Sequence, residues 1–358
     1  MNDCATDDNE PPRPATDGTA SPKARVGLVL GGGGVVGAAY HAGALAAIEQ
    51  DLGWDPRTAD IVVGTSAGSL TGALLRLGVA AADLAALTVG AQAPTVASGL
   101  AARLADRPVF PAFGLQHILR PPNLPSPLLV AGLIRLGLQR RSSVLTALML
   151  FLPTGREELL PHLRFLDGAI GDVWPQDDLL VCAVRATDCR RAVFGPGGRG
   201  GTLSAALAAS CAVPGYFSPV EIDGELYVDG GVISATNADV LRSHRLDLAI
   251  IVSPMTGQAD RLSIGDAARR FCRRAVDHEV RQLEAAGIPN VVIEPGRAVT
   301  RHMSMNFMNE DAVTAIVQEA FFDTGAQIRG SKLLSALRSA RNQSTPPAIT
   351  LGATGATV

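Results

Sequence analysis

Ser66 lies in a sequence pattern that is typical of a catalytic serine. The stretch Asp60-Ile-Val-Val-Gly-Thr-Ser-Ala-Gly-Ser-Leu70 predicts a buried strand, a sharp turn and then a helix, with Ser66 at the apex. A serine there presents its hydroxyl at the positive end of the helix dipole. Gly64 and Gly68 are needed because a side chain at either position would clash with the neighbouring strand or helix. The alternative is an ordinary strand-to-helix turn capped by Ser66, since this pattern also arises by chance in glycine-rich chains.

A run of glycines is the second element with possible chemistry. A predicted buried strand over residues 25–30 leads into Gly31–Gly34, and a helix of small residues follows. The spacing Gly32-x-Gly34-x-x-Gly37 fits a dinucleotide-binding loop, and it fits equally well a loop whose backbone N–H groups form an oxyanion hole. A dinucleotide site would need an acidic residue at the end of the second strand. Asp60 begins that strand instead, so nucleotide binding is disfavoured.

Asp229 is the candidate general base. It precedes Gly230 and Gly231 and follows a predicted hairpin, residues 220–228. An Asp before two glycines is more often a turn residue than a catalytic one, although these glycines would also let the backbone approach closely and present the carboxylate. None of the six histidines lies in a glycine-rich turn at a strand end, where a triad histidine is expected. They are His41, His117, His162, His244, His278 and His302. If Ser66 is a nucleophile, Asp229 is the best available base.

The elements that must position these residues follow an α/β pattern over residues 25–330. Strands are expected at 25–30, 60–63, 178–185, 220–222, 225–228, 247–253 and 290–294, and helices at 38–50, 69–87, 203–210, 263–286 and 310–327. Within the helix 263–286, the residues expected on the core face are Phe271, Val276, Val280 and Leu283. Residues 1–24 predict a disordered tail without a signal peptide, and 331–358 a loose C-terminal tail.

Residues 90–162 interrupt the pattern as a proline-rich insertion. Within it, residues 128–152 are strongly apolar but contain Arg135, Arg140 and Arg141, which argues against a membrane-spanning helix. Two compatible interpretations remain open: a pair of helices packed over the domain, or a cap that contacts lipid with its arginines at headgroup level.

Composition excludes several classes of function. The net charge is −3 and the pI is about 6.1, which gives no support for nucleic-acid binding. The five cysteines have no metal-site or C-x-x-C spacing, so free thiols in a reducing compartment are expected. No metal or cofactor is expected.

The glycine loop, the serine turn and the Asp-Gly-Gly segment, in this order, resemble the patatin-like phospholipases. The segment Ala209-Ser-Cys-Ala-Val-Pro-Gly-Tyr-Phe-Ser-Pro219 strengthens the resemblance, which extends over residues 26–252 apart from the insertion. One departure is Val36, where the family usually has Arg or Lys. The missing cation puts headgroup preference and catalytic strength in question.

The resemblance implies a three-layer α/β/α sandwich with a central, mostly parallel sheet. It also implies a Ser–Asp dyad without histidine, with Ser66 as nucleophile and Asp229 as base. The backbone N–H groups of Gly32, Gly33 and Gly34 would form the oxyanion hole. The supporting motif positions are Gly37, Gly64, Gly68, Gly230 and Gly231.

The function expected from this resemblance is hydrolysis of carboxylic ester bonds in lipids or lysolipids through a serine acyl-enzyme. The alternatives are a weakly active or non-catalytic lipid-binding relative, and an acyltransferase that uses the same dyad. We expect a cytoplasmic protein with peripheral membrane contact and no transmembrane helix.

Overall fold

A computed structural model describes residues 24–93, 155, 157–170, 174–175, 177–257, 264–303 and 307–330. The expected N-terminal and C-terminal tails lie outside the described residues, apart from residue 24. Most of the expected insertion, residues 94–154 with Arg135, Arg140 and Arg141, also lies outside them.

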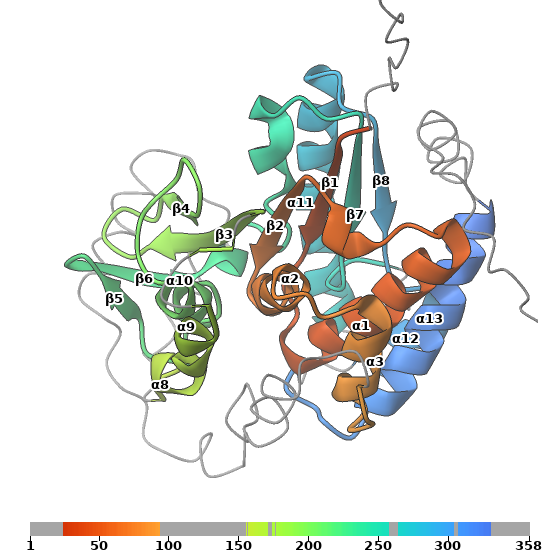
Figure 1. Cartoon of the computed structure of the whole chain (residues 1–358), viewed down its shortest axis with the longest axis horizontal. Helices are drawn as coiled ribbons and strands as arrows, with labels where there is room; N and C mark the ends of the chain where they lie inside the picture. Colours follow the sequence, from red (N-terminus) through yellow and green to blue (C-terminus); the bar gives the residue numbers. More distant parts are fainter. Residues whose placement is uncertain are drawn as a thin grey trace, which may run out of the picture.

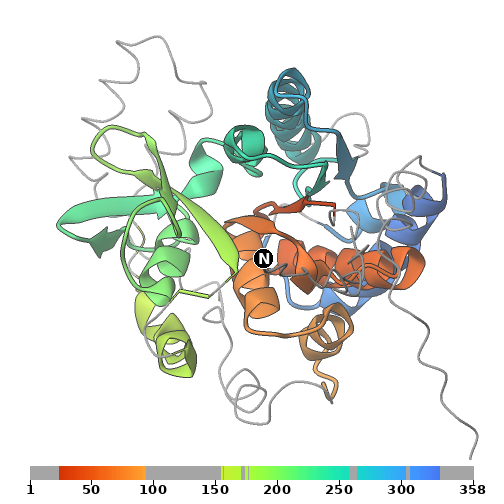
Figure 2. The same cartoon turned by 45° about the horizontal axis from the view of Figure 1, so that its top comes forward.

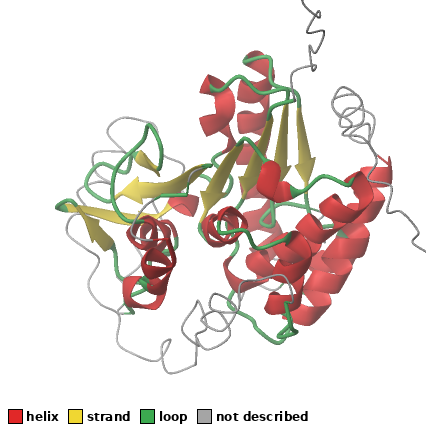
Figure 3. Cartoon of the chain, viewed as in Figure 1, coloured by secondary structure: helices red, strands yellow, loops and turns green. Residues whose placement is uncertain are grey.

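One mixed sheet forms the centre of the molecule (Figures 1 and 3). Its order is β5-β6-β3-β2-β1-β7-β8, and β4 pairs with β3 in addition. The parallel strands are β1 (Val26–Leu30), β2 (Ile61–Thr65), β3 (Asp178–Arg185), β7 (Leu248–Val252) and β8 (Asn290–Ile293). The antiparallel ones are β4 (Arg191–Phe194), β5 (Val220–Ile222) and β6 (Glu225–Asp229).

The helices connect these strands and cover the sheet. They are α1 (Gly34–Leu52), α2 (Ala67–Arg76), α3 (Ala81–Thr88), α8 (Leu160–Leu163), α9 (Phe165–Ile170), α10 (Leu203–Ser210), α11 (Ile264–Ala285), α12 (Arg297–Thr300) and α13 (Val313–Gly330). Three short 3-10 helices join them: η1 (Pro56–Thr58), η2 (Gly230–Val232) and η3 (Ala238–Ser243). Figure 2 shows β5, β6 and α8–α10 at one end of the molecule and α1 and α13 at the other.

Two apolar cores lie on opposite faces of the sheet. In β1, Leu28 and Leu30 belong to the core formed with α1, α2, α10 and α13, whereas Val29 packs with Leu241 of η3 and Leu283 of α11. Both faces are buried because side chains alternate along a strand and each face carries helices. The predicted three-layer α/β/α arrangement is therefore confirmed.

The structure differs from the expected elements most clearly at three places. The helix expected over 69–87 is two helices, α2 and α3, separated at Gly78, whose φ of 87° is unfavourable for other residues. The first helix begins at Gly34, four residues earlier than expected. Strand β4 (Arg191–Phe194) was not anticipated, because the connection from β3, residues 186–190, contains no Gly or Pro that would mark a turn. Among the described helices, none has the length and apolar character to cross a membrane.

Candidate active site

Ser66 is held in a strained turn between β2 and α2. Its φ of 52° and ψ of −125° are rarely adopted by a residue with a side chain, and only 6% of its surface is exposed. The Ser66 backbone N–H donates to Ser210 Oγ at 2.8 Å, and that hydroxyl donates in turn to the Cys182 carbonyl at 2.7 Å. Ser210 thus links the turn to β3, which helps to fix the unusual backbone.

The glycines on either side of Ser66 are required by close backbone contacts. A Cβ at Gly64 would lie 2.4 Å from the Ser69 Cα, and one at Gly68 would lie 2.0 Å from the Leu30 carbonyl oxygen. Backbone atoms cannot move aside as a flexible side chain can, so α2 packs this closely on β1 and β2 only with glycine at both positions.

The sheet register brings Asp229 towards the serine turn. Thr65, at the end of β2, pairs with Cys182 of β3, and Asp229, at the end of β6, pairs with the next β3 residue, Ala183. Gly230 permits the approach, because a Cβ there would lie 2.4 Å from the Cys182 carbonyl oxygen. Strands that arrive from distant parts of the chain therefore end side by side.

Burial makes the Asp229 carboxyl group a stronger base than usual. The residue is 4% exposed, and its Oδ1 accepts from the Gly231 N–H at 2.6 Å. Burial raises the pKa of Asp229 to about 7, although the neighbouring Ser66 hydroxyl and the Gly231 amide lower it. The Ser66 hydroxyl is close enough to affect the pKa, but no hydrogen bond of normal geometry reaches Asp229 Oδ2 from the described residues. Such contacts commonly tighten only when substrate binds.

The glycine loop has two backbone donors that have no partner among the described residues. The Gly32 N–H donates to the Ala235 carbonyl at 2.7 Å, so Gly32 does not serve as an oxyanion donor in this structure. The N–H groups of Gly33 and Gly34 make no hydrogen bond among the described residues. Gly34 has a φ of 62°, and a Cβ there would lie 2.6 Å from the Phe307 carbonyl oxygen. Gly37 donates to the Gly33 carbonyl at 2.9 Å and fixes the loop at the start of α1.

Ser66, Asp229 and the glycine loop line one cavity of about 140 Å³. The other described residues that line it are almost all apolar: Val213, Pro214, Tyr216, Phe217, Val232, Ala235, Met255, Phe271, Cys272, Phe307 and Met308. Gly231, which follows Asp229 closely in the chain, also lines it. Phe271 was expected on the core face of α11 and instead lines this cavity. A larger cavity of about 520 Å³ lies between α1, α2, α3 and α13, but neither Ser66 nor Asp229 lines it, so the candidate chemistry belongs to the smaller one.

No histidine lines the active-site cavity among the described residues. His41 is fully buried in α1, and its Nδ1 lies 3.4 Å from Thr71 Oγ1 of α2. Burial lowers the pKa of His41 to about 3, so this imidazole stays neutral. It has the properties of a buried structural histidine. His117 lies outside the described residues.

Val36, the departure from the family pattern, points into the apolar core beside α1 and is fully buried. Its N–H donates to the Phe307 carbonyl at 3.2 Å. The position therefore contributes no charge near the glycine loop. Among the described residues, no cluster of His, Cys, Asp or Glu side chains could hold a metal ion.

Sequence reasoning missed the residues that support the site. Ser210 was expected in a small-residue helix and in the segment 209–219 that carries the resemblance, but no role was assigned to it, and the apolar wall formed by Met255, Phe307 and Met308 was not singled out. These positions have no short motif, because their role depends on long-range contacts. The signal that could have drawn attention to Ser210 is its place in the segment 209–219, which resembles the family's segment before the Asp.

Comparison with known proteins gives a family match. The family model described as patatin-like phospholipase matches residues 28–242. No curated protein matches the chain.

Several solved structures are similar to the chain. VipD from Legionella pneumophila is 15% identical with a TM-score of 0.41, covering 90% of this chain and 68% of that chain. Human GIVD cytosolic phospholipase A2, in complex with methyl gamma-linolenyl fluorophosphonate, is 13% identical with a TM-score of 0.40. The match covers 90% of this chain and 60% of that chain. The type III effector protein ExoU is 16% identical with a TM-score of 0.35, and the match covers 90% of this chain and 54% of that chain.

Proposed function

This chain belongs to the patatin-like phospholipase family, and on that premise we propose that it hydrolyses carboxylic ester bonds of lipids with Ser66 as nucleophile and Asp229 as base. The observation that carries the proposal is that these two side chains meet around one apolar cavity with two backbone N–H groups that have no partner in the described part of the chain. A nucleophile, a base and an oxyanion site are the three parts that acyl transfer requires.

The reaction follows from the positions of these groups. The Asp229 carboxylate accepts the proton of the Ser66 hydroxyl while Ser66 Oγ attacks the acyl carbonyl carbon. The N–H groups of Gly33 and Gly34 donate to the oxygen that becomes negatively charged, a contribution of roughly 3–4 kcal/mol per donor in comparable sites. Collapse of this intermediate breaks the ester bond, and the leaving alkoxide takes the proton from Asp229.

A second half-reaction regenerates the enzyme. Asp229, again ionised, accepts a proton from water as the water oxygen attacks the acyl-Ser66 carbonyl. The bond to Ser66 Oγ breaks, the serine recovers its proton, and the fatty acid leaves. Water is the acceptor in this proposal; an alcohol in its place would give acyl transfer by the same residues.

The proposed substrate class rests on the walls of the cavity. Aromatic and aliphatic side chains surround Ser66, and they suit a fatty acyl chain better than a polar acyl group. Phospholipids, lysophospholipids and neutral lipids all present such a chain on a carboxylic ester. Peripheral contact with a lipid surface is part of the proposal, because these substrates reside there.

The test is hydrolysis by the purified protein. Short-chain p-nitrophenyl esters are assayed first, followed by phospholipid, lysophospholipid and triacylglycerol with mass spectrometry of released fatty acid. We expect ester turnover by the wild type, its loss in Ser66→Ala with an unchanged melting temperature, and labelling of Ser66 by an organophosphonate probe. A folded wild type that hydrolyses none of these esters, or a probe attached to another residue, would refute the proposal.

A further inference from the structure

One loop, residues 234–238, touches two separate parts of the active site. Its Ala235 carbonyl accepts the Gly32 N–H at 2.7 Å, which anchors the beginning of the glycine loop. Its Asn237 Nδ2 donates to Thr65 Oγ1 at 3.0 Å, directly before the nucleophile. Any shift of this loop therefore moves the oxyanion donors and Ser66 relative to each other.

The conformation of the 234–238 loop needs outside support. Asn237 is fully buried with a φ of 54°, and its Oδ1 has no hydrogen-bond partner among the described residues. Its Nδ2 also donates to the Ser234 carbonyl at 2.7 Å, and Ser234 Oγ accepts the Thr236 N–H at 3.2 Å. Strain and an unpaired polar atom at one buried residue persist only where the surroundings fix them.

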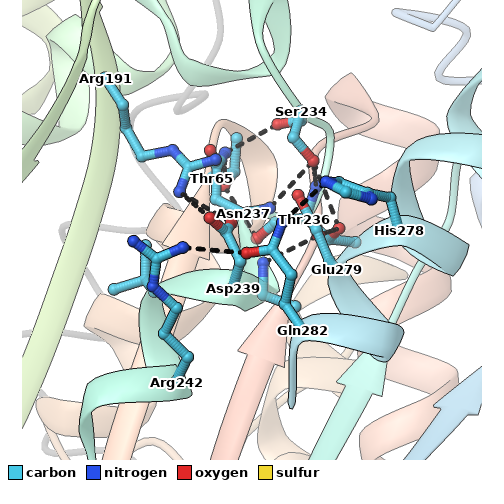
Figure 4. A network of polar contacts seen from close by, with 12 residues as sticks. Thr65, Arg191, Ser234, Thr236, Asn237, Asp239, Arg242, His278, Glu279 and Gln282 are labelled. Carbon is cyan, nitrogen blue, oxygen red and sulfur yellow. Dashed lines mark hydrogen bonds and ion pairs between the residues drawn. The ribbon is translucent and has the colours of Figure 1, made fainter. Parts of the chain in front are cut away.

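Glu279 of α11 provides that support. Its side chain is almost fully buried, and Oε2 accepts from Thr236 Oγ1 at 2.5 Å and from the Ala238 N–H at 2.9 Å (Figure 4). It makes no ion pair with a cation among the described residues, so hydrogen bonds from the loop are what satisfy it. The nearby Asp239 pairs with Arg191 instead. A buried carboxyl group placed this way fixes both ends of the loop segment that surrounds Asn237.

We propose, on the premise of the hydrolase function above, that Glu279 is a positioning residue for catalysis. It acts through the 234–238 loop, which sets the glycine loop through Ala235 and the nucleophile turn through Asn237. Glu279 does not line the cavity and touches no reacting atom. Its removal should therefore slow the chemical step more than it weakens substrate binding.

The test compares Glu279→Met, which keeps side-chain length without an acceptor, with Glu279→Gln, which keeps a carbonyl acceptor. Turnover of a soluble short-chain p-nitrophenyl ester and the rate of Ser66 labelling by an organophosphonate are measured well below the melting temperature. For Glu279→Met we expect kcat and the labelling rate to fall about 10- to 100-fold, the range that a displacement near 1 Å produces. KM should stay within about twofold, because the apolar walls are unchanged, and Glu279→Gln should recover most of the lost kcat.

Two control variants separate positioning from general stability. Leu283→Ala opens a cavity in the apolar core that it shares with Ala238, one turn further along α11, and it leaves both hydrogen-bonding groups of Glu279 in place. It should lower the melting temperature but leave kcat near the wild-type value. His278→Ala changes an exposed neighbour of Glu279 that bonds to Gln282 at 2.8 Å, and it should change neither quantity.

A second pair of variants decides the matter if Glu279→Met does not fold. Thr65→Val removes the hydroxyl that Asn237 bonds and keeps the side-chain shape, while Thr65→Ser retains a hydroxyl. Thr65→Val should lower kcat at constant KM, and Thr65→Ser should retain most of it. An unchanged kcat in a folded Glu279→Met, or in Thr65→Val where that variant must decide, would overturn the proposal. So would an equal loss of kcat in Leu283→Ala at a matched melting temperature.

Failure of the hydrolase function itself gives a different pattern. The wild type would then show neither ester turnover nor Ser66 labelling. The positioning role of Glu279, which rests on the hydrolase function, would be refuted as well. If the wild type turns over the ester and kcat is unchanged in Glu279→Met or Thr65→Val, only the positioning role of Glu279 is refuted.

Discussion

Burial acts in opposite directions on Asp229 and His41, and this explains which of them can serve as a base. Removal from water disfavours the charged form of either group, so the pKa of Asp229 rises to about 7 while the pKa of His41 falls to about 3. The Asp is thereby close to the pKa that suits a general base at neutral pH. The buried imidazole stays neutral and away from the cavity. A dyad without histidine is consistent with these two environments.

The first prediction concerns the pH dependence of hydrolysis. Asp229 must be ionised to accept the serine proton, so kcat/KM for a neutral soluble ester should fall as pH decreases through about 7. The fall should approach about tenfold per pH unit on the acid side, with a plateau above. Initial rates between pH 5 and 9 check this. A flat profile across that range would argue against a base with this pKa.

The second prediction is a gain in stability when the acid is neutralised. The pKa of Asp229 lies above its ordinary value of 3.8, so its contribution to stability is fully present below that value and is lost as pH rises through about 7. At pH 8 the folded protein bears the whole cost of a buried carboxylate. Asp229→Asn removes this cost, so its free energy of unfolding at pH 8 should exceed the wild-type value by up to about 4 kcal/mol, at about 1.4 kcal/mol per pKa unit.

Urea denaturation of both proteins at pH 5 and pH 8 provides the measurement. The advantage of Asp229→Asn should be smaller at pH 5, where the wild-type carboxyl group is largely protonated in the folded state. If the variant is the less stable protein at pH 8, the assigned direction of the pKa shift is wrong.

At the scale of elements, the decisive feature is how closely α2 approaches the strands. The third prediction compares Gly68→Ala with Gly72→Ala, which change the same helix and gain the same helix propensity. A Cβ at Gly68 meets the Leu30 backbone at 2.0 Å, whereas one at Gly72 meets the Val62 side chain at 2.9 Å. Gly68→Ala should therefore destabilise the protein by at least about 3 kcal/mol or prevent folding, and Gly72→Ala should cost clearly less. Thermal melting compares the two, and an equal effect would count against the close approach.

The sequence predicted most elements because their signals are local. The buried strands, the hairpin and the small-residue helices all have periodicity or turn residues that act within a few positions. The break at Gly78 was missed because apolar residues continue on both sides of it. Phe271 was misplaced because helical spacing identifies an apolar face but not whether that face meets the core or a cavity.

The same distinction applies to the candidate site. Ser66, Asp229 and the glycine loop could be proposed from the sequence because their backbone turns require particular residues at fixed spacing. Asn237, Glu279 and Ser210 have their roles only through partners 28 to 172 residues away. No short sequence motif predicts such long-range contacts. The hydrogen bond from the Gly32 N–H to the Ala235 carbonyl likewise depends on the 234–238 loop, which comes from a much later part of the chain.

At the scale of the whole molecule, the site is assembled from many segments around the central sheet. The cavity walls come from the glycine loop, residues 213–217, Met255, residues 271–272 and residues 307–308. Its volume of about 140 Å³ is small beside the roughly 300–1,000 Å³ of typical ligand sites. Only part of an acyl chain fits into it, so the wall residues should set chain-length preference.

The fourth prediction tests this wall. Phe271→Ala enlarges the cavity, so the ratio of kcat/KM for a twelve-carbon ester to that for a four-carbon ester should rise at least about fivefold. Each additional buried methylene group contributes about 0.8 kcal/mol, so one or two suffice. Phe322→Ala, on an exposed face of α13, is the matched control and should leave the ratio unchanged. A ratio that does not change in Phe271→Ala would exclude this wall as the determinant.

The most direct test of the proposed dyad is a double-mutant cycle on kcat/KM with a soluble ester. Ser66→Ala, Asp229→Asn and the double variant are compared with the wild type at pH 8, after each is shown to be folded. Since residues that act as a unit lose function together, each single change should lower kcat/KM by at least about 10³-fold, and the double variant should be scarcely worse. If Asp229→Asn instead retains more than about a tenth of the wild-type activity while Ser66→Ala is inactive, another group takes the serine proton, and the Ser66–Asp229 dyad is wrong.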